Sequence, residues 1–234
     1  NSLESLPDLS GLSNLTFLDI NDNYSLTTLP DLSGLLNLDT LLIYNNSSLE
    51  CALGYPEQLS VEDVWPPVCG EEFTYQVGDL AEGGIVFYVD ETGQHGLVAA
   101  LEDIGQFEWG CSNENVDGAD GTSIGTGYQN TMDIVNQGCS TDNGGVTAAQ
   151  ASLDAEINGY FDWYLPSKDE LTEMYNTIGY GGSEGNIGGF LYEDYWSSSV
   201  YDNLVDAWTF NFNYSESINH GKHNSTRVRV IRSF

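Results

Sequence analysis

The chain has 234 residues, 40% of them hydrophobic, which is enough to bury a core in one large domain or two unequal ones. Asp and Glu number 36 against 5 Lys and Arg, so the formal net charge is -31. Such a charge repels nucleic acid phosphates and anionic lipid heads, and no apolar run approaches the length of a membrane span. We therefore expect no nucleic acid partner and no membrane insertion.

The N-terminal part contains a repeat, since "NSLESLPDLSGL" returns 23 positions later as "YSLTTLPDLSGL". The pattern L-x-x-L-x-I-x-x-N occurs twice, at Leu15, Leu18, Ile20 and Asn23 and again at Leu38, Leu41, Ile43 and Asn46. It resembles the leucine-rich repeat family, in which each turn supplies one short strand and the Asn satisfies backbone groups at the bend. Because so few repeats cannot bury a core alone, we expect residues 1–50 to be the C-terminal part of a longer array. Its role is either a concave binding face or a spacer, and the spacer is favoured.

Residues 51–70 are expected to form a cap and linker, because Pro56, Pro66 and Pro67 break the periodicity. The four cysteines, which allow three pairings, lie at Cys51, Cys69, Cys111 and Cys139. Proximity in the sequence favours a disulfide between Cys51 and Cys69 and another between Cys111 and Cys139. Two disulfides would imply an oxidising compartment, and the Asn-, Ser-, Thr- and Gly-rich surface also suits a secreted protein. We therefore expect an extracellular or cell-surface location.

The remainder, residues 71–234, is expected to be one mixed domain. "EGGIVFYVD" and "TGQHGLVAALE" form two β-rich runs joined by turn residues, which predicts a hairpin. "LPSKDELTEMYNTIG" predicts a helix with a capping box from Ser167 and Glu170. "TAAQASLDAEI" predicts a second helix with Thr147 as its cap.

The block "RVRVIRSF" predicts a final strand with Val228 and Val230 on one face and Arg227 and Arg229 on the other. All three arginines, Arg232 included, fall at this end of an acidic chain. We expect each to find a carboxylate partner and to hold the strand to the domain.

Several blocks carry a family resemblance, among them "GGIVFYVD", "WGC", "GYFDWYLPSKDELTEMY", "YWSSS" and "RVRVIRSF". Their order is similar to that of a bacterial domain family related to the C-terminal domain of collagen-like adhesins. The resemblance implies an α+β, C-type-lectin-like domain with two helices, a small twisted antiparallel sheet and long loops. It also implies an extracellular module that binds a ligand.

Between "YWSSS" and "RVRVIRSF" the chain is similar to the variable regions of proteins diversified by diversity-generating retroelements. From the residues themselves, aromatic Trp208, Phe210 and Phe212 alternate with polar residues, which predicts a strand with one apolar and one polar face. The polar composition resembles an antibody paratope, although an ordinary solvated loop region remains the alternative. The candidate ligand-binding residues are Tyr201, Asp202, Asn203, Asp206, Thr209, Asn211, Asn213, Tyr214, Glu216, Asn219, His220 and His223.

Metal and catalytic chemistry have less support. Formylglycine-generating enzymes share the implied fold and hold copper with a cysteine pair, but no Cys follows Cys139 here and no catalytic motif is found, so we expect no enzyme. The three-residue spacing of His220 and His223 favours exposed loop histidines over a zinc pair. No cofactor is expected apart from an open possibility of structural calcium, whose candidate oxygen donors are Asp117, Asp120, Asp142 and Asn143.

Three functions are therefore left. The first is an adhesion or receptor-binding module that contacts a protein or glycan on another cell or surface. The second is a structural subunit or decoration of an extracellular filament or envelope layer, which packs between copies of itself. An enzyme is the weakest of the three.

Overall fold

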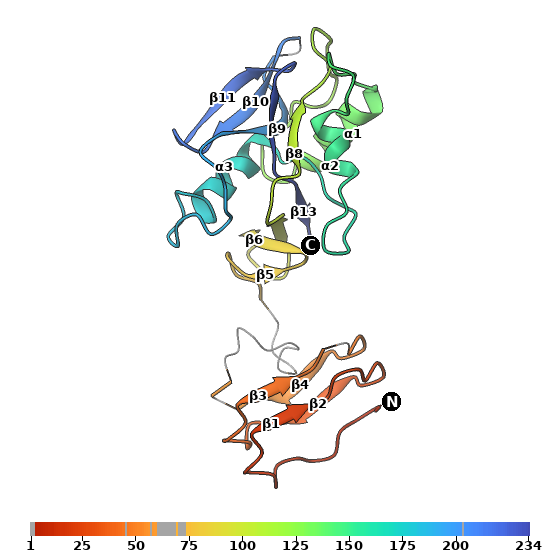
Figure 1. The fold of residues 1–234 in the computed structure, drawn as a ribbon, viewed down its shortest axis with the longest axis vertical. Coiled ribbons are helices and arrows are strands. Elements are labelled where there is room, and N and C mark those ends of the chain that lie inside the picture. Colours follow the sequence, from red (N-terminus) through yellow and green to blue (C-terminus); the bar gives the residue numbers. More distant parts are fainter. Residues whose placement is uncertain (1–2, 45, 57, 60–68, 70–73, 203) are drawn as a thin grey trace. The chain divides into compact units, whose positions relative to one another are not determined.

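The computed structural model describes residues 3–44, 46–56, 58–59, 69, 74–202 and 204–234. They belong to two compact units, Asn1–Phe73 and Thr74–Phe234, called here the N-terminal and C-terminal units. The fold is mixed α+β, with short strands in the N-terminal unit and both sheets and helices in the C-terminal unit (Figure 1). Within the described residues, no helix is both long and apolar enough to cross a membrane.

Short parallel strands stack in the N-terminal unit. β1 (Phe17–Asp19) pairs with β3 (Thr40–Leu42), and β2 (Thr28–Asp31) pairs with β4 (Cys51–Gly54). The expectation of one strand per turn is wrong for residues 24–46, because this repeat contributes both β2 and β3. β4 accordingly begins at Cys51, where a cap and linker were expected. Leucines fill the space between the strand pairs, and the fully buried ones are Leu26, Leu29, Leu32, Leu35 and Leu38.

Two buried asparagines satisfy backbone groups where the turns bend. The Asn23 side chain donates hydrogen bonds to the carbonyl oxygens of Ile20 at 2.7 Å and Asn21 at 3.0 Å. Asn46 donates in the same way to Ile43 at 2.6 Å, and its Oδ1 accepts the backbone N–H of Asn23 at 3.1 Å. The asparagines therefore link one turn to the next, and the role expected for them is confirmed.

The cysteines pair as proximity predicted. Cys51 bonds to Cys69 in the N-terminal unit, and Cys111 bonds to Cys139 in the C-terminal unit. Each bond closes a short loop within its own unit, which stabilises a fold by about 2–4 kcal/mol. Pro66 and Pro67 of the expected linker lie outside the described residues.

A four-stranded antiparallel sheet in the C-terminal unit has the order β13-β7-β6-β5. Its strands are β5 (Leu80–Ala81), β6 (Gly84–Val89), β7 (Gly96–Ala99) and β13 (Ile231–Ser233). The predicted hairpin is confirmed as β6 and β7, which pair directly. Apolar side chains from both strands are buried in the core, as the β-rich runs of the sequence predicted.

The second sheet has five strands in the order β11-β10-β9-β12-β8. They are β8 (Gly105–Glu108), β9 (Asp194–Val200), β10 (Asp206–Asn211), β11 (Glu216–Gly221) and β12 (Ser225–Val228). The chain leaves this sheet after β12 and enters the other one at β13. The single final strand predicted for "RVRVIRSF" is therefore wrong, because the block divides between two sheets.

Three helices complete the C-terminal unit: α1 (Gly127–Gln137), α2 (Ala148–Leu153) and α3 (Lys168–Thr177). The two predicted helices are confirmed, with Thr147 capping α2 and the capping box of Ser167 and Glu170 starting α3.

Helix α1 was not predicted, because its buried face is not apolar. The residues on that face are Gly127, Asn130, Thr131 and Ile134, which have helical spacing but only one large hydrophobic side chain among them. A search for apolar periodicity passes over such a helix.

The serines of "YWSSS" form part of a buried polar network around α1. Asn130 Nδ2 donates to the Gly121 carbonyl oxygen at 2.6 Å and to Ser198 Oγ at 3.3 Å. Ser199 Oγ donates to the same Gly121 oxygen at 2.6 Å, and Ser197 Oγ donates to the Trp208 oxygen at 2.8 Å. The three serines are fully buried, so they tie β9 to β10 and to the segment before α1.

Each of the three arginines has a carboxylate partner, as predicted. Arg229 is buried and bonds through Nε to Asp103 at 2.8 Å, while its Nη1 donates to two backbone carbonyls. Arg232 Nε lies 2.7 Å from Asp162, and Arg227 Nε lies 2.7 Å from Glu193. These bonds join the end of the chain to the segments before β8, α3 and β9. Arg229 lies in the short segment between β12 and β13, where the final block passes from one sheet to the other.

Candidate binding surface

The β10–β11 hairpin separates the predicted binding residues into two groups. Asp206 pairs with Gly221 at one end, and Asn211 pairs with Glu216 at the other. Five steps of about 3.4 Å along a strand separate these ends by roughly 17 Å. We call residues 201–206 with 219–224 the loop end, and residues 211–216 the turn end.

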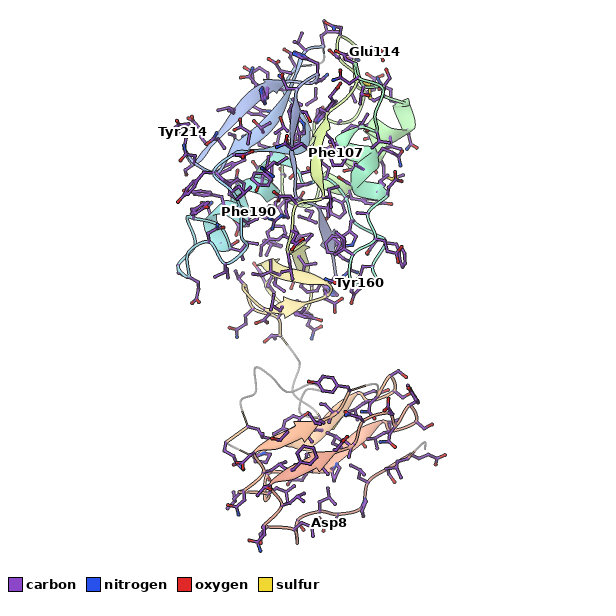
Figure 2. All side chains as sticks on the ribbon, viewed as in Figure 1. Asp8, Phe107, Glu114, Tyr160, Phe190 and Tyr214 are labelled. Carbon is purple, nitrogen blue, oxygen red and sulfur yellow. A yellow bond between two sulfur atoms is a disulfide. The ribbon has the colours of Figure 1, made fainter. Side chains whose placement is uncertain are left out.

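Each end contains part of the predicted set. The loop end contains Tyr201, Asp202, Asp206, Asn219, His220 and His223, and the turn end contains Asn211, Asn213, Tyr214 and Glu216. Thr209 lies between the two ends, and Asn203 lies outside the described residues. Figure 2 shows Tyr214 at the outer side of the C-terminal unit. The predicted residues therefore do not form one continuous surface.

Thr209 and Asn211 were expected to face solvent, and this is wrong because both are buried. β10 is a central strand, and the rings of Trp196 on β9 and His220 on β11 approach to 5.7 Å across it. Thr209 Oγ1 donates to the Ile218 carbonyl oxygen at 3.1 Å. The polar face of this strand is thus covered by its neighbours.

Asn211 builds the turn end rather than a binding face. Its Nδ2 donates to Asp194 at 2.7 Å, and its Oδ1 accepts the backbone N–H groups of Asn213 and Tyr214 at 2.9 and 2.8 Å. The turn leaves the Tyr214 side chain 72% exposed, with Glu216 exposed nearby. The turn end therefore presents one isolated aromatic side chain.

Asp202 orders the backbone of the loop end. Its Oδ1 accepts the N–H groups of Leu204, Val205 and Asp206 at 3.0, 2.7 and 3.2 Å. These backbone bonds, led by Val205, lower the pKa of Asp202 below its ordinary value. The carboxylate is therefore a structural part of the loop, which holds the Leu204 and Val205 side chains exposed beside Tyr201.

A buried lysine connects the loop end to the core of the C-terminal unit. The backbone N–H of Lys222 donates to the Val205 carbonyl oxygen. The Lys222 carbonyl oxygen accepts the backbone N–H groups of Trp109 and Gly110. Lys222 Nζ lies 5.0 Å from the centre of the Trp109 ring. Burial lowers the pKa of Lys222, while the charge of Asp202 acts in the opposite direction. The loop is thus fixed to the core on its inner side.

The outer side of the loop end combines aromatic and polar groups. Tyr201 is 49% exposed and its ring meets Trp208 edge to face at 4.7 Å. Lys168 Nζ lies 4.7 Å from the centre of the same Trp208 ring. Asn219 Nδ2 donates to Asp206 at 2.7 Å. Two rings, an ammonium and a carboxylate–amide pair therefore converge here.

Two of these residues were missed from the sequence. Trp208 was assigned to the apolar face of a strand, although it is only half-buried. Lys168 begins α3, far earlier in the chain, and only the packing of α3 against β10 brings it to the loop end. No local signal in the sequence connects the two.

The histidines and the calcium candidates lie apart from one another or bond to other groups of the protein. His220 is half-buried, with Thr226 Oγ1 3.4 Å from its Nδ1, whereas His223 is exposed. Asp117 accepts a hydrogen bond from Asn115, and backbone groups of the 142–143 loop bond to Glu108. Throughout the described ranges, no three His, Cys, Asp or Glu side chains gather closely enough to hold a metal ion.

Comparison with known proteins assigns no family. No protein-family model matches the chain, and no curated protein matches it significantly. The geometry of the loop end is therefore the basis on which function is inferred.

Proposed function

We propose that the C-terminal unit is an extracellular, C-type-lectin-like module that binds a protein or glycan on another cell or surface, and that the loop end is its binding site. It acts in adhesion, by binding rather than by catalysis. The observation that carries this proposal is the contact between the exposed Tyr201 and the half-buried Trp208, beside a loop whose backbone is ordered by Asp202.

Physical reasons support the loop end over the turn end. Tyr and Trp provide large contact areas with few rotatable bonds, and they dominate many interfaces. Lys168 and the Asp206–Asn219 pair offer charged and neutral hydrogen-bonding groups beside them. Because Asp202 already orders the loop, binding costs little additional conformational entropy.

The N-terminal unit is proposed to be a leucine-rich repeat segment that serves as a spacer. The parallel strands at a 23-residue spacing and the two asparagines that join successive turns support this. The paired cysteines in both units support an oxidising, extracellular location.

Packing between copies of the chain is the second candidate function, and charge argues against it. The net charge is -31, and residues 1–73 contain no Lys or Arg at all. Copies of such a chain repel one another at low salt. Sedimentation of the full chain at low and physiological salt tests this, and we expect a monomer in both.

The binding proposal is tested with the full chain on a glycan array and on whole cells. Replacing Tyr201, Asp206 and Asn219 together with Ala should reduce retention at least tenfold on the surfaces that capture the wild type, with the melting temperature little changed. A matched turn-end variant with Asn213, Tyr214 and Glu216 replaced by Ala should retain binding. Equal retention by the two variants would refute the assignment.

A further inference from the structure

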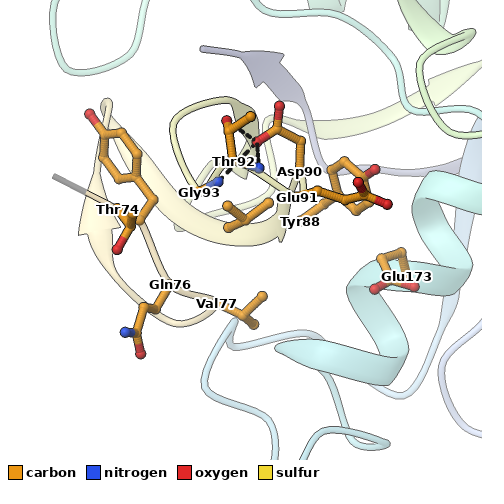
Figure 3. A pocket seen from close by; sticks show the side chains of 11 residues that line it. Thr74, Gln76, Val77, Tyr88, Asp90, Glu91, Thr92, Gly93 and Glu173 are labelled. Atoms are coloured by element: carbon orange, nitrogen blue, oxygen red, sulfur yellow. Dashed lines mark hydrogen bonds between the residues drawn. The ribbon is translucent and has the colours of Figure 1, made fainter. Parts of the chain in front are cut away.

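A shallow pocket lies between the turn of the β6–β7 hairpin and α3, away from the loop end. Its volume is about 500 Å³. Its walls come from residues 74–77, residues 88–93 and Glu173 of α3 (Figure 3). The pocket belongs wholly to the C-terminal unit, and none of its residues was predicted to have a function.

One of its carboxylates is structural. Asp90 Oδ1 accepts hydrogen bonds from Thr92 Oγ1 at 2.6 Å, from Thr92 N at 3.0 Å and from Gly93 N at 3.1 Å. The Thr92 hydroxyl contributes most to lowering the pKa of Asp90. Asp90 therefore fixes the turn that forms one wall of the pocket.

The other two carboxylates have no such role. Among the described residues, neither Glu91 nor Glu173 has a hydrogen-bond or ion-pair partner for its side chain. Glu173 is half-buried, and burial raises its pKa above the ordinary value. A carboxylate that has lost part of its hydration without gaining a partner attracts any cation that reaches it.

An aromatic ring lies with these carboxylates. Tyr88 is half-buried, and Figure 3 shows it next to Glu91, with Glu173 facing the same space from α3. Val77 and Val89 add apolar surface to the lining. A ring face together with two carboxylates provides cation–π and charge-assisted contacts at once, while the valines suit the methylene stem of a long side chain.

None of the Lys and Arg side chains of the chain, all of which the structure describes, lines this pocket. They are Lys168, Lys222, Arg227, Arg229 and Arg232. The three arginines bond to carboxylates elsewhere, Lys168 lies over Trp208, and Lys222 is buried beside Trp109. A Lys or Arg side chain in the pocket therefore has to come from another chain.

We propose that this pocket binds a basic side chain on an exposed segment of a partner protein, held by Glu91 and Glu173 against the Tyr88 ring. The partner segment is basic because the net charge of -31 attracts cationic chains and repels acidic ones. The pocket is separate from the loop end, so this proposal does not depend on the proposed function.

The test uses the full chain and a fluorescently labelled tetralysine peptide, with binding followed by anisotropy at physiological salt. The double variant Glu91→Gln/Glu173→Gln should bind the peptide at least tenfold more weakly than the wild type. The matched control is Glu102→Gln/Glu156→Gln, which removes the same charge from exposed glutamates outside the pocket. It should change the affinity less than twofold. Unchanged melting temperatures in both variants establish that folding is intact.

A second probe separates charge from nonspecific contact. Tetralysine with acetylated side chains, which has lost its ammonium groups, should not compete for the site. The proposal is overturned if the control variant weakens binding as much as the pocket variant, since the general field of the protein then accounts for the affinity. It is also overturned if the acetylated peptide binds as well as tetralysine.

Discussion

The two ends of the β10–β11 hairpin have similar compositions but different roles. At the turn end, the Asn211 side chain forms hydrogen bonds to Asp194 and to the backbone of the turn, and the Tyr214 side chain is exposed to solvent. At the loop end, Asp202 orders the backbone, which leaves Tyr201 and the Asp206–Asn219 pair available to a ligand. A polar, aromatic-rich segment therefore contains residues that build its turns as well as the residues proposed to bind, and the hydrogen-bond partners of each side chain distinguish the two kinds.

The largest expected effect lies in the interior, where polar groups stabilise the fold. Replacing Arg229 with Gln removes the buried guanidinium that Asp103 and two backbone carbonyls share, and leaves Asp103 with only its longer contacts to Arg227 and Tyr195. Removing one member of a buried ion pair costs about 3–5 kcal/mol. Urea unfolding should report a loss of this size.

Arg227→Gln is the matched control, because its ion pair with Glu193 is partly exposed. It should cost no more than about 1 kcal/mol. Equal losses for the two arginine variants would mean that Arg229 is not the principal contact holding the end of the chain.

The next prediction compares two asparagines of the turn end. Asn211→Ala removes the bond to Asp194 and the acceptor for two backbone N–H groups, so unfolding should become easier by roughly 1–3 kcal/mol. Asn213→Ala alters an exposed side chain and should stay within about ±0.5 kcal/mol. Thermal unfolding of both variants checks this. A larger loss for Asn213→Ala would contradict the structural role of Asn211.

The smallest effect concerns pH. The hydrogen bond from Arg232 lowers the pKa of Asp162 below 3.8, so the folded state favours the charged carboxylate. Its contribution to stability is present above that value and is lost as the pH falls through the lowered pKa. Asp162→Asn should cost up to about 1 kcal/mol at neutral pH, because the Asp162 side chain is more than half exposed.

The difference between wild type and Asp162→Asn should disappear when both are unfolded by urea at about pH 2. A difference that is the same at neutral and acidic pH would show that charge is not its cause.

Parts of the fold with a strong local pattern were predictable from sequence. The capping box at Ser167 identified α3, proximity identified both disulfides, and β-rich runs identified the β6–β7 hairpin. Helix α1 was not predictable because its buried face contains Asn130 and Thr131, which are satisfied by distant backbone groups.

The binding surface was harder to predict for a related reason. Alternation along β10 identified which residues share a face, but not that Thr209 is buried in a strand that lies between β9 and β11. Alternation also could not predict the contact between Lys168 and Trp208, because that contact depends on how α3 packs against the sheet. Burial of a polar residue in a central strand is a property of the whole sheet, whereas side-chain alternation is a property of one strand.

The central claim is that binding belongs to the loop end, and a comparison of two tyrosines tests it most directly. Tyr201→Ala and Tyr214→Ala remove the same side chain from exposed positions, one at the loop end and one at the turn end. Retention on whole cells and on a glycan array should fall at least tenfold for Tyr201→Ala and stay within twofold of wild type for Tyr214→Ala, with both proteins folded. Loss of binding in Tyr214→Ala alone, or equal binding by the two variants, would contradict the account.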